Sequence, residues 1–89
     1  MTTTMRLADP VSIWLEDGRP VRLVWRGHRY LVSDTPTPIR ETTGVEGPMH
    51  PTERLRGWRV KGTAAGGDSY VFDVELVGFD KWILIAYYE

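Results

Sequence analysis

The chain is built from short runs in which apolar and polar residues alternate, and each run is bounded by Gly, Pro or Asp. A period of two is typical of β-strands, because successive side chains of a strand point to opposite faces of a sheet. No segment keeps apolar residues at helical spacing for three turns. The 89 residues therefore predict one all-β domain, since a second hydrophobic core would not fit in this length.

The alternating runs predict six antiparallel strands, arranged as two three-strand meanders in a single β domain at 11–89 that follows a flexible tail at 1–10. The expected strands span residues 11–15, 20–26, 29–34, 55–61, 69–77 and 81–88. A long Pro- and Gly-rich loop at 35–53 joins the meanders. The last strand is apolar on both faces, which indicates a central or barrel-closing position. A small SH3-like barrel or a strongly curved sheet would bury both apolar faces.

Three-residue loops are expected in the first and last hairpins, where Gly suits a left-handed position. The loop at 16–18 pairs Ile13 with Val21 on the core face. The loop at 78–80 pairs Leu76 with Trp82, Val74 with Leu84, Phe72 with Ala86 and Tyr70 with Tyr88. All eight of those positions are apolar or aromatic, so the hydrophobic pattern specifies this register.

The stretch VRLVWRGHRYLV contains the one conflict in this scheme. A type II′ turn at 27–28, with Gly first, pairs Trp25 with Tyr30 on the core face. The same register places Arg26 opposite Arg29. Two like charges across a hairpin cost roughly 0.2–1 kcal/mol. An anionic ligand, or an acidic side chain from elsewhere in the fold, would offset the repulsion.

Charge is nearly balanced overall but uneven along the chain, with a formal net charge of −1. Residues 19–34 carry four Arg against one Asp, and residues 54–62 carry four basic side chains and no acidic one. One interpretation is a solvent face on which Trp14, Arg22, Arg26 and Arg29 contact an anion or single-stranded DNA or RNA. A base would stack on the Trp and the arginines would bind phosphates.

A second interpretation needs no ligand. Arg59 and Lys61 would pair with Asp73 and Glu75 on the neighbouring strand, which gives an ordinary solvated face. The pI of about 6.1 favours this interpretation, because domains that bind mainly phosphates are usually markedly basic.

A third interpretation concerns the second face of the last strand, where Ile83, Ile85 and Tyr87 form an apolar stripe. Such a stripe needs a cover, which is the long loop, barrel closure or another protein. If it is exposed, it predicts docking to an unidentified protein partner or to a second copy of the chain.

No motif for chemistry is present. The chain has no Cys, and its two His lack the spacing of metal ligands. We therefore expect no catalytic, cofactor-binding or metal-binding residues and no enzymatic activity. The longest apolar run is too short to cross a bilayer, and residues 1–10 lack the pattern of a signal peptide. These observations predict a cytoplasmic protein that does not bind membranes.

The segment VSIWLEDGRPVRLVWRGHRYLV and the closing WILIAYYE carry a family resemblance. A D-G-x-P turn, here with Asp17, Gly18 and Pro20, precedes a strand that ends W-R-G and then an R-Y strand. This pattern resembles a small bacterial domain family of unknown function. Its members occur alone or attached to proteins similar to Y-family translesion polymerases. The resemblance implies a DNA-repair setting and no particular mechanism.

The sequence thus predicts a non-enzymatic accessory domain that acts as a protein-interaction module and exists as a monomer or weak homodimer. The alternative is weak, sequence-indifferent binding of single-stranded nucleic acid.

Overall fold

The computed structural model describes residues 4–43 and 52–88, with side chains placed for residues 8–41 and 54–88. These ranges form seven β-strands, and they contain no helix that could cross a membrane. The strands are β1 (Thr4–Glu16), β2 (Arg19–Trp25), β3 (His28–Val32), β4 (Thr37–Thr43), β5 (Thr52–Thr63), β6 (Ser69–Leu76) and β7 (Trp82–Tyr88).

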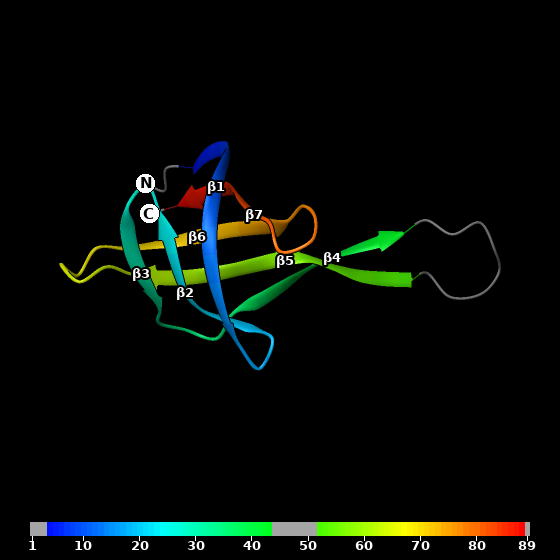
Figure 1. Cartoon of the computed structure of the whole chain (residues 1–89), viewed down its shortest axis with the longest axis horizontal. Helices are drawn as coiled ribbons and strands as arrows, with labels where there is room; N and C mark the ends of the chain where they lie inside the picture. Colours follow the sequence, from blue (N-terminus) through cyan, green and yellow to red (C-terminus); the bar gives the residue numbers. More distant parts are fainter. Residues whose placement is uncertain (1–3, 44–51, 89) are drawn as a thin grey trace.

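Six of the strands close into an antiparallel barrel, which confirms the predicted fold class. The order around the barrel is β3-β2-β1-β7-β6-β5, and pairing of β3 with β5 completes the circle. The two predicted meanders are β1–β2–β3 and β5–β6–β7. Strand β7 lies between β1 and β6, the central position that its apolar faces predict. Figure 1 shows β4 outside the barrel, at the edge of β5.

The barrel interior is filled by apolar side chains from all six barrel strands. Its fully buried members include Leu23, Val60, Phe72, Val74 and Leu84. Aromatic rings pack around Phe72: the ring of Tyr30 lies 4.9 Å from it and that of Trp25 lies 6.0 Å from it, centroid to centroid. Burial of such side chains contributes about 1.5–3 kcal/mol each, so the core stabilises a chain that has no disulfide.

Strand β1 begins at Thr4, seven residues before the expected start. Residues 4–10 therefore form part of the barrel wall, and the predicted tail is wrong for them. They pair with β7, for example Thr4 with Tyr88 and Asp9 with Leu84. The second edge of β7 would otherwise present unpaired backbone N–H and C=O groups, and the N-terminal segment pairs with them. Residues 1–3 lie outside the described residues.

Nine of the eleven described residues of the predicted loop at 35–53 are also strand. Residues 37–43 form β4 and pair with β5, which begins at Thr52. Pro38 is tolerated because β4 is an edge strand. The two strands form an arm that projects away from the barrel (Figure 1). Residues 44–51, between the two strands in the sequence, lie outside the described residues.

The turn of the β1–β2 hairpin is one residue shorter than expected. Asp17 and Gly18 occupy the turn with φ of 53° and 77°, the combination of a two-residue type I′ turn. Leu15 then pairs with Pro20 and Ile13 with Leu23, so Val21 is the extra residue of a β-bulge. The predicted pair of Ile13 with Val21 is wrong for this reason.

The β2–β3 hairpin removes the predicted opposition of the two arginines. Arg26 and Gly27 form the turn, with φ of 51° and 79°. Val24 therefore lies opposite Arg29, and Leu23 lies opposite Tyr30. The turn is type I′, with Gly in second position and a left-handed Arg in first position.

The β6–β7 hairpin follows the predicted register for its first two pairs, Leu76 with Trp82 and Val74 with Leu84. A bulge at Ile85 then shifts the remaining pairs by one residue, so Phe72 lies opposite Tyr87. The bulge reverses the alternation of the last residues of β7, which turns Tyr87 toward the core.

Candidate functional site

Arg26, one of the predicted anion-binding residues, is held within the fold by an acidic side chain. Its guanidinium lies 3.0 Å from the Asp9 carboxylate. The indole Nε1 of Trp25 donates to the same carboxylate at 3.1 Å, and Arg26 covers the Trp25 ring at 4.6 Å from its centroid. The acidic partner expected from elsewhere in the fold is therefore Asp9, on β1. This pairing leaves Arg26 a poor candidate for binding an external phosphate.

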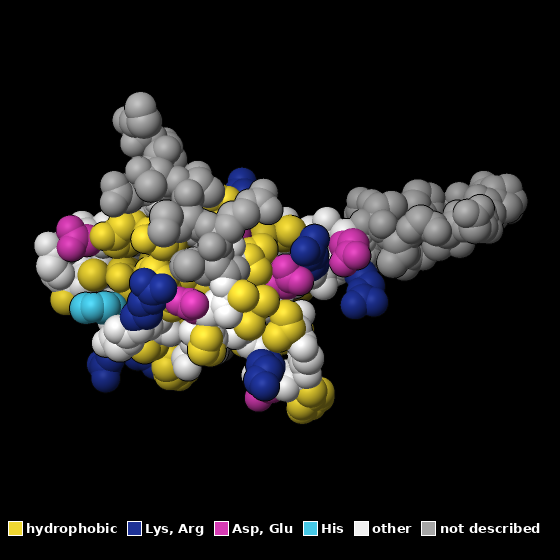
Figure 2. All heavy atoms as spheres, turned by 90° about the horizontal axis from the view of Figure 1, so that it is seen from above, with side chains coloured by type: hydrophobic (Ala, Val, Ile, Leu, Met, Phe, Trp, Pro, Cys, Tyr) yellow, Lys and Arg dark blue, Asp and Glu magenta, His cyan; other side chains and the backbone are white. Residues whose placement is uncertain are grey.

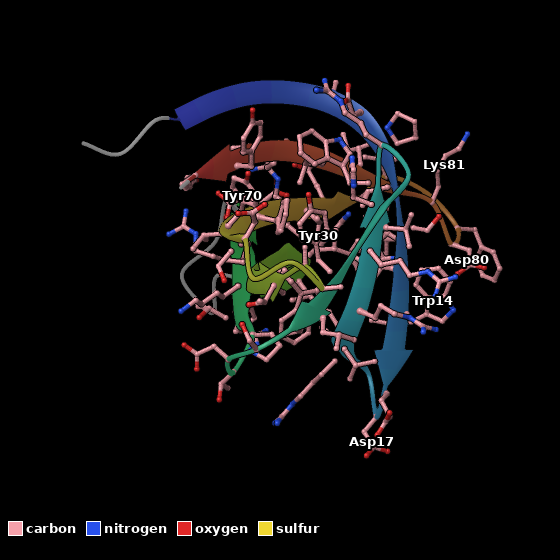
Figure 3. All side chains as sticks on the ribbon, turned by 90° about the vertical axis from the view of Figure 1, so that its left-hand side faces the viewer. Trp14, Asp17, Tyr30, Tyr70, Asp80 and Lys81 are labelled. Atoms are coloured by element: carbon pink, nitrogen blue, oxygen red, sulfur yellow. The ribbon has the colours of Figure 1, made fainter. Side chains whose placement is uncertain are left out.

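Trp14, Arg22 and Leu31 form a row across the outer face of β1, β2 and β3. Trp14 lies opposite Arg22, and Arg22 lies opposite Leu31. The Arg22 guanidinium lies 4.5 Å from the centroid of the Trp14 ring. Figure 3 shows Trp14 on the outside of the ring of strands, whereas Tyr30 and Tyr70 lie within it. The structure thus brings together two of the four predicted nucleic-acid contacts.

Apolar side chains surround this row and remain exposed to solvent. The exposed fractions are 42% for Trp14, 49% for Leu15, 36% for Val21 and 62% for Leu31. Together with Arg22 and the acidic Glu16 they line one shallow depression. We call Trp14, Leu15, Val21, Arg22 and Leu31 the meander face. Across the barrel in Figure 2, yellow apolar side chains likewise reach the surface between blue and magenta charged ones.

Arg29, the fourth predicted contact, borders the meander face. It lies two residues before Leu31 on β3, and it shares a second depression with Arg22 and Leu31. In the part of the chain that the structure describes, neither Arg22 nor Arg29 forms an ion pair. They are therefore two cations whose charge no described carboxylate neutralises at contact distance.

The arginine of the second basic segment is engaged with its neighbour strand. Arg59 Nε donates to Asp73 at 2.7 Å, Arg59 Nη2 donates to the other carboxylate oxygen at 3.0 Å, and the Tyr88 hydroxyl donates to Asp73. The hydrogen bond and charge of Asp73 raise the pKa of Arg59. The predicted Arg59–Asp73 pair is thereby confirmed. Glu75 pairs instead with Arg56 at 3.1 Å, and Lys61 lies opposite Val71.

The apolar stripe predicted on β7 is largely covered by the chain itself. Tyr87 packs into the core, with its ring 4.9 Å from that of Trp25 and 5.9 Å from that of Tyr70. Ile83 and Ile85 are half-buried. Exposed large apolar side chains lie instead on the meander face, at the β6–β7 hairpin (Leu76, Val77 and Phe79) and at Leu55 of β5. Ile83, Ile85 and Tyr87 offer little area to a protein partner.

Sequence reasoning missed Leu15, Val21 and Leu31 as members of the site. The expected registers placed Val21 on the buried face, and the bulge at that residue turns it outward. The alternation pattern carries no signal for this bulge; in the structure Pro20 is fully buried and takes the inward position instead. Leu31 was detectable, since it alternates with Tyr30 and must face outward if that ring faces the core.

The described residues contain no group of three or more His, Cys, Asp or Glu side chains placed to hold a metal ion. His28 is exposed at the start of β3, and His50 lies outside the described residues.

No family model, curated protein or solved structure matches this chain. The resemblance to a bacterial domain family of unknown function therefore stays a prediction. The class that the fold and the site define is a small closed β-barrel with an exposed, partly basic apolar face.

Proposed function

We propose that this protein is a non-enzymatic interaction module that binds a partner protein through the meander face. The observation that carries the proposal is the exposure of Trp14, Leu15, Val21 and Leu31 around one surface depression. Contiguous apolar side chains of this size on a small domain mark interaction sites. Trp and Arg are also the residue types most enriched where binding energy concentrates in protein interfaces.

The two carboxylates that form ion pairs and several hydrogen bonds have structural roles, which supports a binding role over catalysis. The carboxylates of Asp9 and Asp73 are each bound by an arginine of the same chain. Both therefore have a structural task, and neither is presented to a substrate.

A selection experiment tests the proposal although the partner protein is unidentified. Random dodecapeptides displayed on phage are selected on the wild-type protein, and the recovered peptides are then measured against variants. We expect W14A and L31A to weaken binding by about tenfold or more, as loss of an interface hot spot does. F79A is the matched control, because Phe79 is a fully exposed apolar side chain on the β6–β7 loop.

Two results would overturn the proposal. One is recovery of no binding peptide. The other is recovery of peptides that bind W14A and L31A as well as they bind the wild type.

Single-stranded nucleic acid is the second candidate, favoured by the stacking of Arg22 on Trp14 and by the nearby Arg29. The charge supports it less, because Arg26 and Arg59 are paired within the fold. Titration of the ¹⁵N-labelled protein with oligo-dT tests it. Amide shifts confined to β1–β3 that weaken sharply between about 50 mM and 200 mM salt would indicate phosphate binding.

A further inference from the structure

A groove continues from the meander face across the seam where β3 meets β5. It has a volume of about 610 Å³ and combines apolar walls with two cations. Its lining consists of the apolar residues Leu31, Val32, Ala64 and Ala65, the hydroxyl-bearing Ser33 and Thr63, and the two arginines Arg22 and Arg29.

Strand register places both arginines beside Leu31. Arg22 lies directly opposite Leu31 on β2, and Arg29 precedes Leu31 by two residues on the same face of β3. The two arginines are therefore diagonal neighbours. The Cα atoms of a diagonal pair lie about 7–8 Å apart. Both arginines line the groove, and the Arg22 guanidinium also stacks on the Trp14 ring.

The far wall of the groove carries short side chains, some polar and some apolar. Thr63 lies opposite Leu31 across the seam, and its hydroxyl forms hydrogen bonds with Ser33 at 3.0 Å and Ser69 at 2.9 Å. Ala64 follows and packs against the core. Small side chains here leave room for an apolar side chain of a ligand to rest on Leu31.

We propose that the groove binds an acidic segment of the partner protein, in which a Glu or Asp carboxylate sits between Arg22 and Arg29. An apolar side chain next to that carboxylate packs against Leu31 and Ala64. This inference rests on the proposed function, since it names the chemistry of the partner at the same surface. Charge complementarity carries it: within the described residues neither arginine forms an ion pair, and the two lie together in one groove.

The apolar lining favours a peptide over a nucleic acid. A phosphate backbone needs a row of cations, and its sugars gain little from Leu31 and the alanines. An acidic peptide uses both properties of the groove, because guanidinium groups bind carboxylates in a bidentate manner and apolar side chains bury area beside them.

The test uses the dodecapeptides selected on the wild-type protein. We expect them to be enriched in Glu or Asp next to an apolar residue. Each is synthesised with its acidic residues and again with the matching amides, and binding is followed by fluorescence anisotropy. R22Q and R29Q should each weaken binding of the acidic peptide by about tenfold, as loss of a charge-assisted hydrogen-bonded pair does. Neither substitution should change the affinity for the amide peptide.

R40Q is the matched control, because Arg40 is an exposed arginine on the arm, on β4. It removes the same charge and should leave the affinity unchanged. An equal loss in R40Q would show a nonspecific effect of net charge and overturn the inference.

Three further results would overturn it in distinguishable ways. Peptides that need Trp14 and Leu31 but ignore R22Q and R29Q would refute the acidic ligand and keep the proposed function. Tight binding of oligo-dT that is lost in R29Q would assign the groove to nucleic acid. Self-association in sedimentation that is lost in F79A would make a second copy the occupant, through its exposed Phe79 and Asp80.

Discussion

Among the described side chains, Asp73 is the one charged group that the barrel buries, with 6% of the residue exposed. It lies on the outer side of β6, where Arg59 from β5 binds it with two hydrogen bonds and Tyr88 from β7 donates a third. The bulge in β7 makes this arrangement possible, since it brings Ala86 opposite Asp73 and aims Tyr88 at the carboxylate. A buried carboxylate with these partners joins three strands.

Removal of Arg59 should lower the free energy of unfolding more than removal of the nearby Arg56. R59A leaves the Asp73 carboxylate buried without its cation, which should lower the free energy of unfolding by about 2–3 kcal/mol. R56A breaks the more exposed pair with Glu75 and should cost less than about 1 kcal/mol. Urea unfolding followed by Trp fluorescence measures both.

The double variant R59A/D73N is the control for that interpretation. It removes the unpaired charge and should recover part of the loss. Equal costs for R59A and R56A would show that burial of Asp73 has no energetic consequence.

The ionisation of Tyr88 should make the stability of the protein depend on pH in the alkaline range. Its hydrogen bond to Asp73 and its burial raise the pKa of Tyr88 above the ordinary value of 10.0. Below pH 10 the phenol is protonated in both states, so its contribution to stability is fully present. Above pH 10 the unfolded state loses the proton first, and the contribution disappears as the pH passes the folded pKa.

Comparison with Y88F isolates this effect. The difference in unfolding free energy between wild type and Y88F should be constant below pH 10 and should shrink above it. A difference that grows between pH 10 and higher pH would show that the folded protein favours the ionised phenol.

The sequence predicted the Arg59–Asp73 contact but not the Arg26–Asp9 contact. Arg59 and Asp73 lie on adjacent strands of a hairpin, so the alternation pattern placed them opposite each other. Arg26 and Asp9 meet across β1 and β2, and Asp9 lies in a segment whose pattern indicated a tail. The partner that holds Arg26 in its left-handed conformation was therefore invisible to reasoning about the hairpin alone.

At the scale of elements, the strands were predictable and their bulges were not. The alternation patterns of β2, β3, β5, β6 and β7 fixed the existence of these strands and the fold class. Bulges at Val21 and Ile85 depend on how the whole barrel curves, and a period of two carries no information about that. Because one extra residue reverses the faces that follow, these bulges also decided which side chains form the site.

Gly57 marks the point where β5 leaves the barrel to enter the arm. A Cβ atom there would overlap the Val74 carbonyl oxygen of β6 and lie 2.9 Å from the Cα of Glu75. Both are backbone atoms, so the strands would have to separate. G57A should therefore lower the free energy of unfolding by about 1–3 kcal/mol.

G66A is the matched control for that substitution. A Cβ at Gly66 meets nothing within 4 Å, so the change should be neutral or stabilise by up to about 1 kcal/mol. Thermal unfolding of the three proteins gives the comparison. A G57A protein as stable as wild type would mean that β5 and β6 are not packed as closely as the structure has them.

At the scale of the whole molecule, the barrel and the arm have different roles in stability. The barrel closes at two places, where β1 meets β7 and where β3 meets β5. Every member of the buried core comes from the six barrel strands, and β4 contributes none among the described residues. A two-stranded ribbon without a core face adds little stability by itself.

The barrel should accordingly fold without the arm. Ile39 and Gly57 lie opposite each other where the arm begins, so Asn-Gly in place of residues 40–56 joins them by a two-residue turn. The replacement removes the exposed Arg56–Glu75 pair, which contributes about 0–1 kcal/mol, and it shortens the connection, which lowers the entropy cost of closure. The free energy of unfolding should therefore stay within about 1 kcal/mol of wild type in urea. Deletion of residues 1–8 removes the pairs that β1 forms with Ala86, Tyr87 and Tyr88. It should destabilise the protein strongly, because these are three of the six pairs that close the barrel between β1 and β7. If the two changes had the opposite ranking, the arm would be the element that holds the fold together, and the closed barrel would not be the stable unit of this chain.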